Sequence, residues 1–163
     1  QGCLLALGTL AGARRPRRVL DMGTGSAVLA IGAARLWPTA RILAVDNDPI
    51  AVRVAAENVS INRVDARVRC VVGDGYTGAE VRRRAPYDVI LANILADPLI
   101  ELAPDLARHL APGGHAVLSG LLDRQAEAVV AAHRRHGLRL VDRAGHGPWV
   151  ALVLAAPPAA RRR

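Results

Sequence analysis

Residues 17–34 read RRVLDMGTGSAVLAIGAA, and the rest of the fold is built outward from this stretch. A short apolar run ends in Asp21, two glycines follow at Gly23 and Gly25, and an apolar helical pattern comes after them. A strand that turns through Gly-x-Gly into a helix lets backbone N–H groups approach a ligand with no Cβ in the way. The positive end of the helix dipole lies at the same place. The stretch therefore predicts a strand, a ligand-binding turn and a helix.

The next apolar run, residues 41–45, ends in Asp46, which lies 21 residues after Gly25. At this spacing, an acid at the end of the second strand of a β-α-β unit reaches the hydroxyls of a bound ribose. Asp46 is thus the expected ribose ligand, with helix capping as its alternative role. Asp48, directly before Pro49, is expected to cap the following helix. The chain therefore begins as a nucleoside-binding unit.

The residues around the turn favour S-adenosylmethionine over a dinucleotide. The dinucleotide fingerprint has a third glycine three residues after the second, and this sequence has Val28 there. Asp21 comes two residues before the first glycine, where a carboxylate would repel a pyrophosphate but attract an ammonium group. S-adenosylmethionine carries an ammonium group and an adenosine but no phosphate. The alternative is a tight turn in a doubly wound domain whose binding site lies elsewhere.

The composition is that of one globular domain. The chain has 163 residues, of which 52% are hydrophobic and 22% charged, which is enough to bury a core. All 22 basic residues are arginine and the formal net charge is +8, but the arginines are scattered and only 2% of residues are aromatic. This pattern favours a generally basic surface over nucleic-acid binding. Cys3 and Cys70 lie far apart, and no apolar run approaches the ~20 residues of a membrane span, so we expect a reduced cytoplasmic protein with no membrane partner.

Strands and helices alternate along the chain, which is typical of an α/β fold with a mostly parallel sheet and helices on both faces. A Pro-Gly-Gly turn precedes the fifth strand, and the last two strands are expected to pair antiparallel. We expect residues 157–163, rich in proline and arginine, to be a disordered tail. The expected helices are 4–10, 26–36, 49–60, 96–110 and 123–136, and the expected strands are 18–22, 41–46, 66–72, 87–92, 115–119, 138–142 and 150–154.

Four polar residues lie at the carboxyl ends of expected strands: Asp21, Asp46, Asp74 and Asn93. Ligands of open α/β sheets bind outside these strand ends, so the four side chains are expected to share one rim. Asp74 could accept a hydrogen bond from the adenine amino group while Gly75 leaves room for the ring. Gly-Asp-Gly is also ordinary turn chemistry, which is the alternative.

Asn93 is the candidate catalytic residue. Its polar amide enters an otherwise apolar strand end before Ile94 and Leu95. A buried amide needs a hydrogen-bond partner, and a substrate nitrogen could be that partner. The full set of candidate cofactor-binding residues is Asp21, Gly23, Gly25, Asp46, Asn47, Asp74, Gly75 and Asn93.

The histidines are not expected to act in the site, and no metal site is expected. His133 and His136 flank two arginines and predict an exposed helix face, while His109 and His115 flank the Pro-Gly-Gly turn and are expected at the surface. His146 and Trp149 near the last strands could line a pocket, but Trp149 is expected to pack in the core. The sequence has no P-loop, kinase signature or Ser-His-Asp order that would support phosphoryl transfer or hydrolysis.

Four blocks together resemble the ribosomal protein L11 methyltransferase family, a bacterial group of class I S-adenosylmethionine-dependent enzymes. The similarity runs from about Leu4 to Leu154, and its most specific part is Asn93-Ile94-Leu95-Ala96 followed by Pro98-Leu99. The blocks are LDMGTGSAVLAIGA (20–33), AVDNDPIAV (44–52), DVILANILADPLIELAPDLA (88–107) and LAPGGHAVLSGLLDRQAEAV (110–129).

The resemblance implies a Rossmann-like class I methyltransferase fold with a seven-stranded sheet whose last strand is antiparallel. It implies cofactor contacts at Gly23, Asp46 and Asn93. The family trimethylates the N-terminal amine and lysine side chains of ribosomal protein L11, so L11 is the expected protein partner. The family pattern is Gly-x-Gly-x-Gly, and this sequence has Ala27 at the position of the third glycine.

Family members also carry an N-terminal domain that recognises L11, and a loop rich in glycine and threonine just before the position of Gln1. Neither has a counterpart in this sequence, and a first residue other than methionine suggests a piece of a longer chain. We therefore expect residues 1–156 to be the S-adenosylmethionine-binding catalytic domain alone.

The implied reaction is displacement of a methyl group from a sulfonium by a neutral amine. A lysine amine has an ordinary pKa of ~10.4, and an apolar pocket would favour its neutral form. The hypothesis is that the Asn93 side-chain oxygen and nearby backbone carbonyls accept hydrogen bonds from the amine. The alternatives are a methyltransferase for another protein lysine or a small amine, a cofactor-binding remnant without catalysis, and an RNA-binding module.

Overall fold

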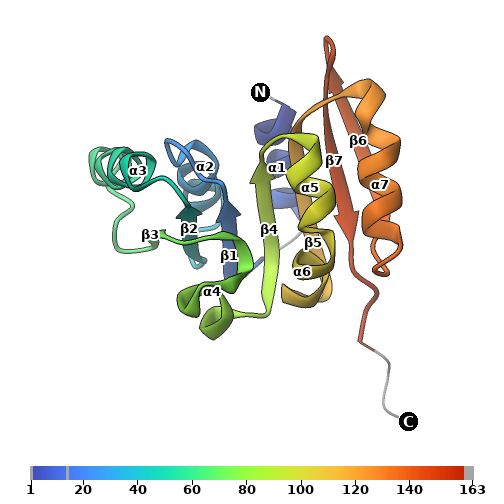
Figure 1. Ribbon diagram of the computed structural model, residues 1–163. Helices are drawn as coiled ribbons and strands as arrows, with labels where there is room; N and C mark the ends of the chain where they lie inside the picture. Colours follow the sequence, from blue (N-terminus) through green and yellow to red (C-terminus); the bar gives the residue numbers. More distant parts are fainter. Residues whose placement is uncertain (1, 14, 160–163) are drawn as a thin grey trace.

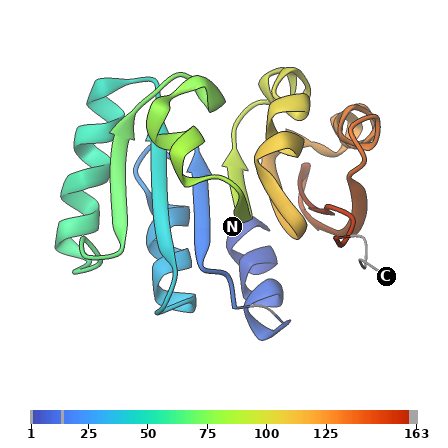
Figure 2. The same ribbon diagram turned by 90° about the horizontal axis from the view of Figure 1, so that it is seen from below.

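The computed structural model describes residues 2–13 and 15–159 and consists of one central sheet with helices on both faces (Figures 1 and 2). The seven strands lie in the order β3-β2-β1-β4-β5-β7-β6. All neighbouring pairs are parallel except those of β7, which runs antiparallel to both β5 and β6. This confirms the expected α/β class, strand number and antiparallel last strand. The strands are β1 Arg18–Met22, β2 Arg41–Asp46, β3 Val68–Val72, β4 Tyr87–Asn93, β5 Leu110–Leu122, β6 Arg139–His146 and β7 Trp149–Ala155.

The helices form two layers because the strand side chains alternate between the two faces of the sheet. Val19, Ile42 and Val89 pack in one apolar cluster with α1–α3, whereas Leu20 and Leu43 pack in another with α4–α7. The helices are α1 Gly2–Ala13, α2 Val28–Leu36, α3 Pro49–Ile61, α4 Ala79–Arg84, α5 Ala96–Glu101, α6 Ala103–His109 and α7 Ala126–Arg134, with single 3₁₀ turns η1 Gly75–Thr77 and η2 Asp123–Gln125.

Besides shifts in the end residues of several elements, two predicted helices and one predicted turn differ from the structure. The helix expected over 96–110 is two helices, because Pro104 lies in the first turn of α6 and has no N–H to continue α5. The helix expected over 123–136 begins as η2, and α7 covers only Ala126–Arg134. The Pro-Gly-Gly turn lies within β5, where the register against β4 shifts between Tyr87 and Val89.

Two histidines expected at the surface are buried. His133 is fully buried, and its Nδ1 lies 2.8 Å from the Val129 carbonyl oxygen. It belongs to the inward stripe of α7 with Val129 and Val130, so the flanking arginines were a misleading signal. His115 is 7% exposed inside β5, and the partly buried His109 packs on Tyr76 with ring centroids 5.0 Å apart.

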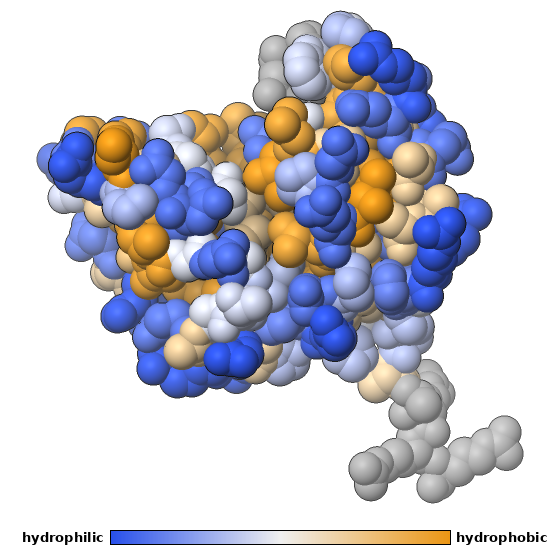
Figure 3. All heavy atoms as spheres, viewed as in Figure 1, coloured by the Kyte–Doolittle hydropathy of each residue, from blue (hydrophilic) through white to orange (hydrophobic). Residues whose placement is uncertain are grey.

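The face of the molecule seen in Figure 3 carries both polar and apolar side chains. Apolar side chains show over α3, where Ile50, Val54 and Ile61 are exposed. No helix within residues 2–13 and 15–159 is long and apolar enough to cross a membrane. Of the expected tail, residues 157–159 form no helix or strand, and the Pro157 carbonyl accepts a hydrogen bond from the Gly113 amide; residues 160–163 lie outside the described residues.

Candidate functional site

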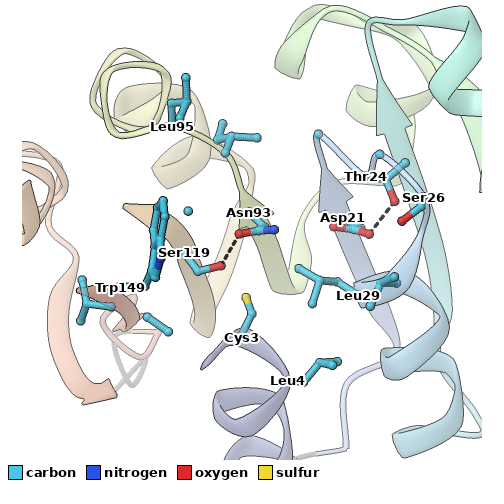
Figure 4. A pocket seen from close by; sticks show the side chains of 17 residues that line it. Cys3, Leu4, Asp21, Thr24, Ser26, Leu29, Asn93, Leu95, Ser119 and Trp149 are labelled. Carbon is cyan, nitrogen blue, oxygen red and sulfur yellow. Dashed lines mark hydrogen bonds between the residues drawn. The ribbon is translucent and has the colours of Figure 1, made fainter. Parts of the chain in front are cut away.

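A cavity of about 700 Å³ opens at the carboxyl ends of β1, β4 and β5 (Figure 4). The first turn of α1 and the start of β7 line its other sides. The start of β7 reaches the cavity because the turn between β6 and β7 projects beyond the same edge of the sheet (Figure 1). The cavity is lined by Cys3, Leu4, Asp21, Gly23, Thr24, Gly25, Ser26, Val28, Leu29, Asn93, Ile94, Leu95, Ser119, Gly120, Trp149, Val150 and Ala151.

Asp21 is the buried acid of this cavity, with only 1% of its surface exposed. Its Oδ2 accepts hydrogen bonds from the Thr24 hydroxyl at 2.6 Å and from the Ala30 amide at 3.0 Å, which ties the glycine turn to α2. Its Oδ1 has no hydrogen-bond partner among the described residues. Burial raises the pKa of this carboxyl to about 6. Asp21 therefore holds the turn with one oxygen and leaves the other for a cation or a donor.

The glycine turn has three residues in the left-handed region. Gly23, Gly25 and Ala27 have φ of 67°, 54° and 63°. Ala27, the position of the family's third glycine, thus adopts a conformation that costs an alanine about 1–2 kcal/mol. Its amide bonds the Thr24 carbonyl at 2.9 Å, and its own carbonyl accepts from Ile31 at 2.9 Å, which starts α2.

Asp46 lies beside this turn but not in the cavity lining. Its Oδ2 accepts a hydrogen bond from the Gly25 amide at 2.9 Å, and its Oδ1 accepts one from the Asp48 amide at 3.1 Å. Asp48 caps α3 by accepting from Ile50 at 2.8 Å, as predicted. Asn47 is exposed at the same strand end. The predicted ribose ligand is therefore positioned by the turn itself.

Asp74 and Gly75 follow β3, next to the end of β2 and outside the cavity lining. The Asp74 side chain is exposed, and its backbone carbonyl accepts from the Thr77 hydroxyl at 2.8 Å. Gly75 begins η1 with φ of 52°. The structure thus gathers Asp21, Gly23, Gly25 and Asn93 around one cavity and leaves Asp46, Asn47, Asp74 and Gly75 outside its lining.

Asn93 ends β4 with its side chain exposed to the cavity, so the expectation of a buried amide was wrong. The reason is that the strand ends there and Ile94, not Asn93, packs against the core. Its Oδ1 accepts a hydrogen bond from the Ser119 hydroxyl at 2.8 Å (Figure 4). Ser119 lies directly opposite Asn93 in the β4–β5 register.

The other lining residues were not among the predicted site residues, and they include Cys3, Thr24, Ser119 and Trp149. Ser119 could have been found, because it ends the expected fifth strand as Asn93 ends the fourth. Cys3 carries no local signal, since only the packing of α1 beside β5 and β7 brings it to the cavity. Trp149 was expected in the core but is 52% exposed, because it is the first residue of β7 beyond the turn.

In the described part of the chain, no three His, Cys, Asp or Glu side chains gather in a metal-binding arrangement. Cys3 and Cys70 are both free thiols. The polar groups of the cavity are one carboxylate, one amide, hydroxyls, the Cys3 thiol and the Trp149 indole N–H. These groups can bind an ammonium, orient an amine and bond hydroxyls.

The comparisons with known proteins agree with this geometry. Residues 1–157 match the family described as Ribosomal protein L11 methyltransferase (PrmA). The chain is 48% identical over 154 residues to the ribosomal protein L11 methyltransferase of Bradyrhizobium diazoefficiens, covering 94% of this chain and 52% of that protein. The corresponding protein of Brucella suis is 48% identical over 153 residues, with 94% and 53% covered. This chain spans about half the length of these relatives.

A solved structure also matches. The ribosomal protein L11 methylase of Lactobacillus delbrueckii subsp. bulgaricus superposes with a TM-score of 0.79 at 27% identity, covering 94% of this chain and 77% of that one. The family match covers nearly all of the sequence, and the likeness in fold extends over the same length. The chain belongs to the ribosomal protein L11 methyltransferase family.

Proposed function

We propose that residues 1–156 form a methyltransferase domain that transfers methyl groups from S-adenosylmethionine to amines of ribosomal protein L11. The observation that carries this proposal is the cavity in which the Asp21 carboxylate and the Asn93 amide lie at the ends of the neighbouring strands β1 and β4, in a chain of this family. A single acid and a single amide in an otherwise largely apolar lining suit a small cationic ligand and an amine.

The residues present fit the cofactor. The unpartnered Asp21 Oδ1 would accept a hydrogen bond from its ammonium group, and the turn at Gly23 and Gly25 would lie against its methionyl part. Asp46 would bond the ribose hydroxyls from beside Gly25. The adenine would lie toward the ends of β2 and β3, where Asn47, Asp74 and Gly75 would border it.

When bound, S-adenosylmethionine supplies an electrophilic methyl group on a sulfonium. The chain's own contribution is to hold a neutral amine in line with it, which is worth up to about 7–11 kcal/mol in favourable cases. Leu4, Leu95 and Trp149 border the cavity and are each more than 40% exposed, so they would lie against the alkyl part of a lysine and disfavour its charged form. The Asn93 Oδ1 would accept a hydrogen bond from the amine and thereby direct its lone pair.

The partner in this proposal is a protein, with no membrane or nucleic acid involved, and the expected setting is the cytoplasm. Recognition of L11 would rest largely on the N-terminal domain that the resemblance implies. A methyltransferase for another protein lysine or a small amine is the second candidate. It is favoured by the exposure of apolar residues that border the cavity, Leu95 at 71% and Val28 at 53%.

Two measurements on the purified chain test the proposal. Calorimetry should show one-site binding of S-adenosylmethionine, and an assay of S-adenosylhomocysteine release should show turnover with L11. The turnover should rise when the chain is fused behind the N-terminal domain of a relative. Binding without turnover in either form would identify a non-catalytic remnant, and turnover only with small amines would support the second candidate.

A further inference from the structure

One hydrogen bond in the cavity has no role in the proposed chemistry so far. The Ser119 hydroxyl donates to the Asn93 Oδ1 at 2.8 Å, and Ser119 is only 7% exposed. The two residues face each other at the carboxyl ends of β4 and β5, and both line the cavity. A hydroxyl at a strand end can also bond water or the backbone, so the hydrogen bond from Ser119 to the Asn93 amide is one of several that the hydroxyl could form.

The backbone next to Asn93 is already held from both sides. A Cβ on Gly23 would lie 2.4 Å from the Ile94 Cγ2, and a Cβ on Gly120 would lie 2.5 Å from the Ile94 carbonyl oxygen. Ile94 is therefore wedged between the glycine turn and β5. With the backbone fixed in this way, the main freedom left to Asn93 is rotation of its side-chain amide.

The Asn93 amide lies between Ser119 and Trp149 on one side of the cavity and Asp21 on the other (Figure 4). Its oxygen points toward Ser119, on the side where Trp149 lies, and its nitrogen points toward the side of Asp21. The two ends of a side-chain amide differ in their hydrogen bonding, because the oxygen only accepts hydrogen bonds and the nitrogen only donates them. The orientation of the amide, with its oxygen or its nitrogen toward a given side of the cavity, thus decides what that side can bind.

We propose that Ser119 is a positioning residue that fixes the orientation of the Asn93 amide, so that its oxygen faces the part of the cavity that receives the acceptor amine. This inference rests on the proposed function. The Ser119 hydroxyl uses one lone pair of Oδ1, and the second lone pair accepts a hydrogen bond from the amine. A rotated amide would direct N–H groups to the amine instead. Those groups would bond the amine lone pair, which is the pair that must attack the methyl group.

The thiol of Cys3 supports the same orientation. Cys3 lies beside Ser119, and burial raises the pKa of its thiol to about 11, so the thiol is protonated at neutral pH. A protonated thiol is a weak hydrogen-bond acceptor, so the Asn93 Oδ1 is the better acceptor for the Ser119 hydroxyl hydrogen. A rotated Asn93 amide would leave that hydrogen without an acceptor at a nearly buried position.

The test compares Ser119→Ala with Ser119→Thr, which keeps a hydroxyl, and with the exposed Ser60→Ala as a matched control. Ser119→Ala should lower kcat about tenfold, as expected for the loss of one hydrogen bond, while KM for the amine and the Kd for S-adenosylmethionine change less than about threefold. Ser119→Thr should recover most of kcat, and Ser60→Ala should match the parent.

A readout independent of activity is the side-chain amide of Asn93, observed by ¹⁵N nuclear magnetic resonance. Ser119→Ala should shift or broaden this pair of signals while the backbone signals remain those of the folded protein. Ser119→Thr should restore the Asn93 signals of the parent. Unmoved signals together with unchanged kcat in Ser119→Ala would overturn the inference. If Asn93→Ala also left kcat unchanged, the proposed role of Asn93 in the reaction would be wrong. If the parent protein shows no turnover, the amide signals of Asn93 still show whether Ser119 orients its side chain.

Discussion

The two halves of the sheet's carboxyl edge differ in how their polar groups are satisfied. At the ends of β1, β4 and β5, Asp21 is buried with one oxygen unpartnered among the described residues, and Asn93 is exposed to a cavity and oriented by Ser119. At the ends of β2 and β3, Asp46 bonds two backbone amides and Asp74 is exposed beside a 3₁₀ turn. Both halves carry acids, but only the first leaves a buried group unsatisfied.

This difference indicates which half is committed to a ligand. An unpaired buried oxygen costs free energy in the empty protein, and this cost is recovered when a donor binds. The acids of the β2–β3 half already form turns and caps, so a ligand there would compete with or add to existing bonds. We therefore expect substitutions in the first half to affect chemistry and those in the second half to affect mainly affinity and stability.

The largest expected effect is that of Asn93→Ala. It should abolish turnover and leave S-adenosylmethionine binding weakened but measurable, because the amide that orients the amine is lost while the glycine turn and Asp21 remain. Asn47→Ala, which removes an exposed amide from the other half, should change only the cofactor Kd, by a few fold. The measurement is S-adenosylhomocysteine release beside calorimetry. Equal loss of turnover in both variants would erase the distinction between the halves.

The next largest effect concerns backbone space. Gly23→Ala should lower the free energy of unfolding by about 3–5 kcal/mol, because its φ of 67° disfavours alanine and its Cβ would lie 2.4 Å from Ile94. Gly75→Ala also has a positive φ, but its Cβ would lie 3.4 Å from Leu102 and should cost only about 1–2 kcal/mol. Urea unfolding checks both values. A similar loss in the free energy of unfolding for the two variants would show that the Ile94 side chain can move away from the added Cβ at little cost.

Asp21→Asn should make the protein more stable at pH 8 and weaken cofactor binding. The pKa of Asp21 is raised from 3.8 to about 6 in the folded state, so the folded protein favours the protonated acid. Its stabilising effect is full below pH 3.8 and is lost as pH rises through 6, a change of about 3 kcal/mol. Asparagine keeps an acceptor for Thr24 and Ala30 but does not titrate.

The check is urea unfolding of both proteins from pH 4 to pH 8. The parent should lose stability over this range relative to Asp21→Asn, and the two curves should converge near pH 4. Parallel curves would mean that Asp21 is charged without cost in the fold. Saturating S-adenosylmethionine should reduce the difference for the parent, because its ammonium group would offset the buried charge.

The sequence predicted the elements whose signals are local. Strands β1 and β2 and the Asp48 cap were predicted as they are found, because apolar runs, a following glycine turn and an Asp-Pro pair are all read from neighbouring residues. The break before Pro104 was misjudged, since an apolar helical pattern outweighed the missing N–H. Such local signals suffice for the fold class and for the strand-end acids.

Features that depend on packing between distant segments could not be read in this way. Cys3 reaches the cavity only because α1 packs beside β5 and β7, and Trp149 borders it only because the β6–β7 turn projects past the sheet edge. The Asn93–Ser119 bond needs the β4–β5 register, which the shift between Tyr87 and Val89 sets. The sequence therefore indicated four residues of the candidate site, but not the rest of the cavity lining or the hydrogen bonds within it.

The smallest of the expected effects separates two acids of the β2–β3 half that stand two residues apart. Asp46→Ala should raise the cofactor Kd about tenfold, since it removes the acceptor expected for the ribose and frees the Gly25 amide. Asp48→Ala should leave that Kd within about twofold of the parent and lower the free energy of unfolding by about 1 kcal/mol, because it removes the cap of α3. Calorimetry and urea unfolding of both variants measure the two effects separately. If Asp48→Ala weakened binding as much as Asp46→Ala, the carboxylate at the strand end would act by shaping the loop and not as a ribose ligand, and the second half of the edge would be structural throughout.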